Sequence, residues 1–133
     1  NLGDLTIRGG AGAEANGQLV HGGRASDGVK SGDINVVSKG SVTLTGGAGA
    51  VAASAQIGHG GTLANGDASG HINVIAATDF NAVGGPGTWA FTQVGHGGAG
   101  STGDFSGHIK VDAGNNILLQ NPSKVGGQTY HAT

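Results

Sequence analysis

Three histidines are the residues of this chain whose type and spacing could do chemistry. His21, His59 and His96 each open a His-Gly-Gly triplet, and they lie 38 and 37 residues apart. Imidazole is a common metal ligand, so stacked copies could form a metal ladder. The alternative is a tight turn in which the imidazole bonds a loop carbonyl. We favour the turn, because isolated histidines are a weak metal signal, and we expect no cofactor.

The three triplets belong to a repeat that covers nearly the whole chain. Residues 21–36, 59–74 and 96–111 share HGG, four variable residues, Gly, two variable residues, Ser-Gly, one variable residue and an apolar-polar-apolar run. A fixed period of this size is typical of a repeat architecture. Within it, His71 and His108 occupy one further position, which Asp33 holds in the first copy.

Strand patterns, and no helical pattern, lie between these loops. Apolar and polar residues alternate over 34–36, 42–44 and 53–57, which is the period of a β-strand. Glycine pairs such as Gly46-Gly47 end several of these runs and suit corners. We therefore predict an all-β fold, a parallel β-solenoid or β-helix built from repeats of 37 or 38 residues. Residues 1–133 would form a single segment of about three and a half repeats.

The apolar positions that recur at this period predict the core. Stacked on successive repeats, their side chains would form inward columns. These residues are Leu5, Ile7, Ile34, Val36, Val42, Leu44, Ile57, Ile72, Val74, Phe80, Val94, Ile109, Val111, Ile117 and Leu119.

The composition favours thin stacked layers over one large core. The chain has 30 Gly, no Cys, and only one Trp, one Tyr and three Phe. We expect two coils per repeat, with one large triangular coil per repeat as the alternative. Coils stack about 4.8 Å apart, so two coils would separate histidines of one column by about 9.6 Å. One zinc ion could not bridge that distance, because its bonds to nitrogen are about 2.0–2.1 Å long.

The third strand of each repeat carries the most specific surface feature. Gln18, Gln56 and Gln93 hold one position, and alternation places them outside, where stacked amides could bond as a ladder. The same alternation exposes Trp89 and Phe91, which could contact a partner or a glycan. The alternative is a bulge that shifts the register and tucks both rings inward.

Several function classes are disfavoured. A net charge of −2 with 11% charged residues does not suit nucleic acid or anionic membranes. A membrane-spanning helix needs a long apolar run, which the sequence lacks, so we expect no membrane insertion. Asp33, Asp79 and Asp112 fall at different repeat positions, which does not suit a shared acid-base site. We therefore expect no enzymatic activity.

The segment SGDINVVSKGSVTLTGGAGA, followed by SAQIGHGG, resembles the repeats of large bacterial secreted exoproteins of the filamentous haemagglutinin and autotransporter adhesin type. The similarity covers nearly the whole chain. It implies a right-handed parallel β-helix at the bacterial cell surface or outside the cell, acting as an adhesin, a stalk or a component of a biofilm matrix. The last copy departs from the pattern, because Gln120 is followed by residues without Gly-Gly or HGG at the expected places.

These observations predict a structural segment of a secreted, adhesin-like or filament-forming surface protein. A carbohydrate-binding β-helix module that uses Trp89 and Phe91 is the alternative, with a host or matrix glycan as its ligand. A strand pattern begins at Leu5, close to Asn1. Because bare strand edges recruit further strands, we expect end-to-end self-association or continuation into further repeats of a longer protein.

Overall fold

The computed structural model describes residues 3–49 and 51–120, which form a parallel β-solenoid without helices. Each strand pairs in parallel with its counterpart in the next repeat. The strands are β1 (Leu5–Arg8), β2 (Gly17–His21), β3 (Lys30–Ser31), β4 (Ile34–Ser38), β5 (Val42–Thr45), β6 (Ala55–His59), β7 (Ala68–Ser69), β8 (Ile72–Ala76), β9 (Phe80–Val83), β10 (Thr92–His96), β11 (Phe105–Ser106), β12 (Ile109–Ala113) and β13 (Ile117–Gln120).

The strands form four sheets that run along the solenoid. Their orders are β1-β5-β9-β13, β2-β6-β10, β3-β7-β11 and β4-β8-β12. Over residues 3–49 and 51–120, three coils are therefore stacked, and β13 adds a fourth strand to the first sheet. The described residues include no helix that could cross a membrane.

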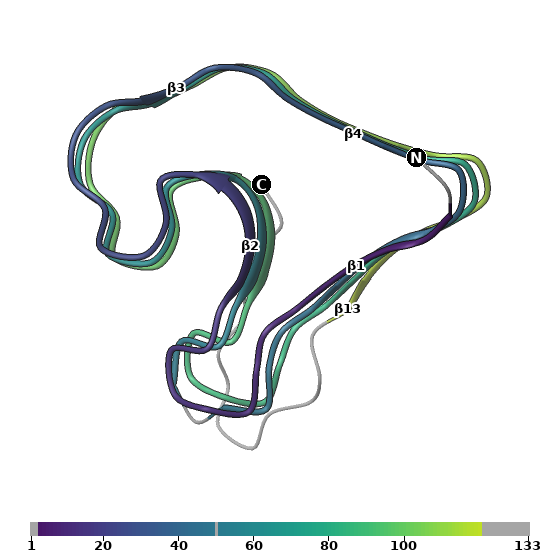
Figure 1. Cartoon of the computed structure of the whole chain (residues 1–133), viewed down its shortest axis with the longest axis horizontal. Coiled ribbons are helices and arrows are strands. Elements are labelled where there is room, and N and C mark those ends of the chain that lie inside the picture. Colours follow the sequence, from purple (N-terminus) through teal and green to yellow (C-terminus); the bar gives the residue numbers. More distant parts are fainter. Residues whose placement is uncertain (1–2, 50, 121–133) are drawn as a thin grey trace.

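Each repeat makes one coil, so the prediction of two coils per repeat is wrong. Leu5 pairs with Val42, 37 residues later, and Ile34 pairs with Ile72, 38 residues later. Viewed down the axis, the chain retraces one wide outline (Figure 1). The physical reason is that one coil per repeat stacks each strand on its own counterpart, which has the same alternation. Two coils would stack unlike segments.

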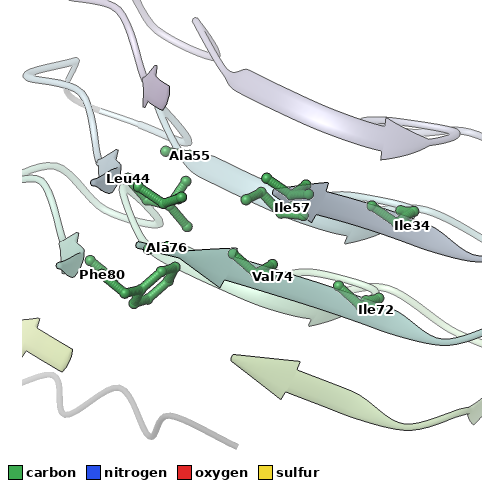
Figure 2. Packing of buried hydrophobic residues seen from close by; sticks show 11 residues of the cluster. Ile34, Leu44, Ala55, Ile57, Ile72, Val74, Ala76 and Phe80 are labelled. Carbon is green, nitrogen blue, oxygen red and sulfur yellow. The ribbon is translucent and has the colours of Figure 1, made fainter. Parts of the chain in front are cut away.

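Apolar side chains from three of the sheets fill the space inside this outline (Figure 2). Leu44, Ile57 and Val74 are fully buried, and Phe80 is 2% exposed. Fully burying one such side chain stabilises the fold by about 1.5–3 kcal/mol. The buried members of the predicted core are Ile34, Val36, Val42, Leu44, Ile57, Ile72, Val74 and Phe80. Those partly buried against them are Leu5, Ile7, Val94 and Val111.

The remaining predicted core residues are exposed, which corrects their assignment as buried. Ile109 is 41% exposed, Ile117 is 54% exposed and Leu119 is 56% exposed. All three continue the inner columns, because Ile109 pairs with Ile72 and Ile117 pairs with Phe80. They lie on the last described coil, where no described strand covers them. Their exposure therefore reflects their place in the stack.

Many glycines lie where the backbone of one coil rests directly on the next. A Cβ atom at Gly49 would lie 2.1 Å from the carbonyl oxygen of Gly12, one coil below. A Cβ at Gly70 would lie 2.2 Å from the oxygen of Gly32, and one at Gly107 would lie 2.0 Å from the oxygen of Gly70. Any side chain at these corners would force the coils apart. Close stacking therefore explains much of the high glycine content.

Candidate functional site: an inner column of histidines

His21, His59 and His96, here called the inner histidine column, end three strands of one sheet. They close β2, β6 and β10, and the parallel register places His21 opposite His59 and His59 opposite His96. The ring centroids lie 5.0 Å and 4.8 Å apart. Since each repeat makes one coil, this is about half the separation expected from two coils.

The imidazoles point toward the corner between the third and fourth sheets. The Nε2 atom of His59 lies 2.6 Å from the carbonyl oxygen of Gly32, and His59 is fully buried. A Cβ at Gly32 would lie 3.2 Å from Cε1 of His21. The glycine of the repeated Ser-Gly pair therefore leaves room for the ring. The imidazole of His59 therefore contacts a loop carbonyl, and this carbonyl belongs to the preceding coil rather than to the His-Gly-Gly segment of His59 itself.

A hydrogen bond between two imidazoles defines their protonation. Nδ1 of His59 and Nδ1 of His96 are 3.0 Å apart. Because a carbonyl oxygen only accepts, Nε2 of His59 carries the proton that is donated to Gly32. A neutral His59 then accepts at Nδ1, so Nδ1–H of His96 is the donor. This network assigns the Nε2–H tautomer to His59 and the Nδ1–H tautomer to His96.

The assignment leaves a lone pair on Nε2 of His96. This atom is buried and has no hydrogen-bond partner among the described residues. Burial, and secondarily the neighbouring His59, lower the pKa of His96 below its ordinary value of 6.5. The physical cause is that an added charge would be poorly solvated and would face a second imidazole. The site is therefore arranged to hold His96 as a neutral ring.

The column offers few lone pairs to a metal ion. Among the described residues, no group of three or more His, Cys, Asp or Glu side chains could hold one. In the neutral pair, Nδ1 of His59 already accepts a hydrogen bond, and Nε2 of His96 is buried. His21 is exposed at the first coil. The geometry favours hydrogen bonding between coils over metal coordination.

A second column, here called the outer histidine column, consists of Asp33, His71 and His108. The rings of His71 and His108 stack at 5.1 Å with an interplanar angle of 11°. An Asp33 carboxylate oxygen accepts the backbone N–H of His71 at 2.8 Å, and Nδ1 of His71 accepts the backbone N–H of His108 at 3.0 Å. The side chains of Asp33 and His71 thus each accept a corner amide of the next coil.

Gln56 is buried, whereas Gln18 and Gln93 at the same repeat position are half-buried, which corrects the prediction that this position faces solvent. Gln56 and the neighbouring Ser54 are fully buried, because the segment that follows each of these strands turns back beside its outer face (Figure 1). Gln18 donates to the amide oxygen of Gln56 at 3.3 Å, but Gln56 donates to the carbonyl oxygen of Gly97 at 2.6 Å. Gln93 donates to the carbonyl oxygen of His96 at 3.1 Å. Gln18 therefore links β2 to β6, Gln56 links β6 to the segment after β10, and Gln93 bonds within β10.

The aromatic pair lies between the two alternatives that the sequence left open. Trp89 and Phe91 are both half-buried, neither fully outside nor tucked into the core. The register is unshifted at the following strand, where Gln93 pairs with Gln56. Trp89 occupies a corner with φ 58°, and the equivalent Ala52 has φ 52°. Because Trp89 precedes β10, the turn at this corner, and not alternation along the strand, sets the direction of the indole.

Sequence reasoning missed Lys30, a buried cation. It is 5% exposed, and its Nζ donates to the carbonyl oxygens of Gly28 at 2.6 Å and Asn65 at 2.5 Å. Its partner in the next coil is Ala68. An available signal was that Ala68 and Phe105 hold the same repeat position, which marks it as apolar and inward. Lys30 therefore joins two corners in adjacent coils.

No family model matches this chain, no curated protein matches it, and no solved structure matches it. The functional argument therefore depends on the fold and on the geometry of its columns.

Proposed function

We propose that this chain is a structural segment of a secreted, adhesin-like or filament-forming surface protein, without enzymatic activity. The observation that carries the proposal is the stacking of one wide coil per repeat in register along four sheets. Each coil contacts only its neighbours, which suits an element that transmits length and stiffness along an axis. The resemblance of the repeats to secreted bacterial exoproteins supports an extracellular location.

Axial packing can extend the described stack in two ways, by further repeats or by end-to-end association of this chain. β13 is the fourth strand of its sheet, whereas the other three sheets have three strands among the described residues. Because bare strand edges recruit further strands, either arrangement would cover the exposed ends of the inner columns.

Two substitutions with matched exposure test this axial packing. Ile117 is 54% exposed and continues an inner column, while Val37 is 53% exposed and points outward from β4. In the full-length protein, Ile117→Asp should lower the melting temperature, because a further coil would bury the carboxylate. Val37→Asp, the control, should leave it nearly unchanged. Equal effects of the two substitutions would contradict axial continuation.

The location is tested separately on intact cells that make the protein. Antibodies raised against residues 1–133 should label the cell surface or extracellular fibres in immunogold electron microscopy. Protease added outside the cells should remove the label. Labelling confined to the cell interior, and resistant to external protease, would refute the proposed location.

A carbohydrate-binding module remains the second proposal, because Trp89 and Phe91 are close in sequence and half-buried. Aromatic rings that are partly exposed can stack on apolar ligand surfaces. A glycan array with the intact chain should then give ligands whose binding falls in Trp89→Ala and in Phe91→Ala. Loss in neither variant, or no bound glycan, would contradict this proposal.

A further inference from the structure

We propose that the His59–His96 pair is an acid-sensitive clasp, which holds the end of β10 on β6 at neutral pH and releases it on acidification. The clasp includes one backbone hydrogen bond, because the N–H of Gly97 donates to the carbonyl oxygen of His59 at 2.7 Å. The side-chain bond between the two Nδ1 atoms lies beside it, at 3.0 Å. Both join the second coil to the third.

Neither imidazole has a good place for an added proton. A proton on Nε2 of His96 creates a buried N–H group without an acceptor among the described residues. If the proton is added to His59 instead, the charge lies on a fully buried residue. Nδ1 of His59 then donates to Nδ1 of His96, so the neutral ring of His96 carries its hydrogen on Nε2. Both forms therefore leave an unpaired donor at the buried Nε2 of half-buried His96, and the second form also buries the charge on His59, which is costly.

The charged surroundings offer no compensating partner. The two ion pairs among the described residues, Arg24 with Glu14 and Lys110 with Asp112, do not include either histidine. Titratable or charged groups on and between the surrounding elements are His21 on β2, Lys30 on β3, Asp33 before β4, Asp67 before β7, His71 before β8, Asp104 before β11, His108 before β12, and Lys110 and Asp112 on β12. Of the carboxylates, Asp33 and Asp67 accept backbone N–H groups of the next coil, and Asp112 pairs with Lys110. Lys30 is cationic, and His21 can become so. A Cβ at Gly60, next to His59, would lie 3.7 Å from Cδ of Lys30, and the ring of His21 lies 5.0 Å from that of His59.

The direction of the pH effect follows from linkage. Burial and His59 lower the pKa of His96 below 6.5, so the folded chain binds this proton less readily than the unfolded chain. Unfolding or local opening therefore takes up a proton, and the folded state loses stability as the pH falls below about 6.5. The loss grows with further acidification until the pH passes the folded pKa. Above about pH 7.5, this contribution to the pH dependence disappears.

The first experiment compares urea unfolding of the 133-residue chain at pH 7.5 and pH 5.0, for the wild type, His96→Gln and His108→Gln. One suppressed histidine raises the unfolding constant by up to about 30-fold over this interval. We expect His96→Gln to lose that component, and His108→Gln, an exposed member of the outer column, to keep it. Equal pH dependence in the wild type and His96→Gln would overturn the proposal.

A second experiment on the unmodified chain decides the matter if His96→Gln does not fold. A ¹⁵N NMR titration should show His96 with a protonated Nδ1 and an unprotonated Nε2 at pH 7.5, and should show it titrating below 6.5. Hydrogen exchange, corrected for the intrinsic rate, should show the amide of Gly97 losing protection at pH 5.0. The reference is the amide of Ile72, which donates to the backbone carbonyl oxygen of His108 at 2.9 Å and should keep its protection. Titration of His96 at or above 6.5, or unchanged protection of Gly97, would refute the clasp.

Discussion

A pair of equivalent glycines provides a sharp test of the stacked coils. Gly12 and Gly49 occupy the same repeat position in the first and second coils, and neither has a positive φ. A Cβ at Gly49 would lie 2.1 Å from the oxygen of Gly12 and 3.1 Å from Cβ of Ala53. A Cβ at Gly12 would meet only Cβ of Ala15, at 3.9 Å. Replacing glycine by alanine should therefore change the free energy of unfolding in opposite directions at the two positions.

The magnitudes follow from two opposing effects. Replacing Gly by Ala reduces the entropy of the unfolded chain, which stabilises the folded state by about 0.4–1 kcal/mol where the backbone permits it. Gly12→Ala should show this gain. At Gly49 the new methyl group lies more than 1 Å inside an ordinary contact distance, and overpacking of this kind costs about 1–3 kcal/mol. Gly49→Ala should therefore lower the free energy of unfolding.

The assay is urea unfolding of the 133-residue chain, followed by far-ultraviolet circular dichroism, with thermal melts as a second measure. The two variants should differ by about 1.4–4 kcal/mol, with the wild type between them. An equal shift in both variants would show that the second coil does not rest on the first in this register. The reasoning would also fail if Gly49→Ala were the more stable of the two.

Three other outcomes are expected. Ile72→Ala should lower the free energy of unfolding by about 2–5 kcal/mol. Ile109→Ala in the same column should cost less than half as much, since Ile109 is 41% exposed and Ile72 is 1% exposed. Urea unfolding of both variants measures the ratio of the two losses. Ala25 has φ 51°, a left-handed backbone conformation that disfavours Ala. Ala25→Gly should therefore stabilise the folded chain by about 1 kcal/mol. A lower melting temperature of this variant would contradict the expectation of backbone strain at Ala25. Chelator should leave the melting temperature unchanged and Zn²⁺ titration calorimetry should show no stoichiometric uptake, because His59 uses both ring nitrogens in hydrogen bonds and Nε2 of His96 is buried. A large drop with chelator would favour a metal ladder.

The sequence alone determined the class of fold and the pairing of equivalent residues. Period-two alternation predicted strands, and a spacing of 37 or 38 residues predicted that Ile34 would share a column with Ile72, as it does. These features are local or periodic, so they can be read without knowing the path of the chain. The histidine columns were predicted on the same basis, since a fixed period stacks like on like.

Only the tertiary structure decided how wide a coil is and which faces are covered. The number of coils per repeat depends on how far the corners turn, which glycine-rich sequence leaves open because glycine permits many turns. The burial of Gln56 depends on a loop that returns beside its strand, which alternation along one strand cannot show. The exposure of Ile117 depends on its place at one end of the described stack. The bond between His59 and His96 requires a single-coil separation of 4.8 Å, so its chemistry became visible only once the coils were placed.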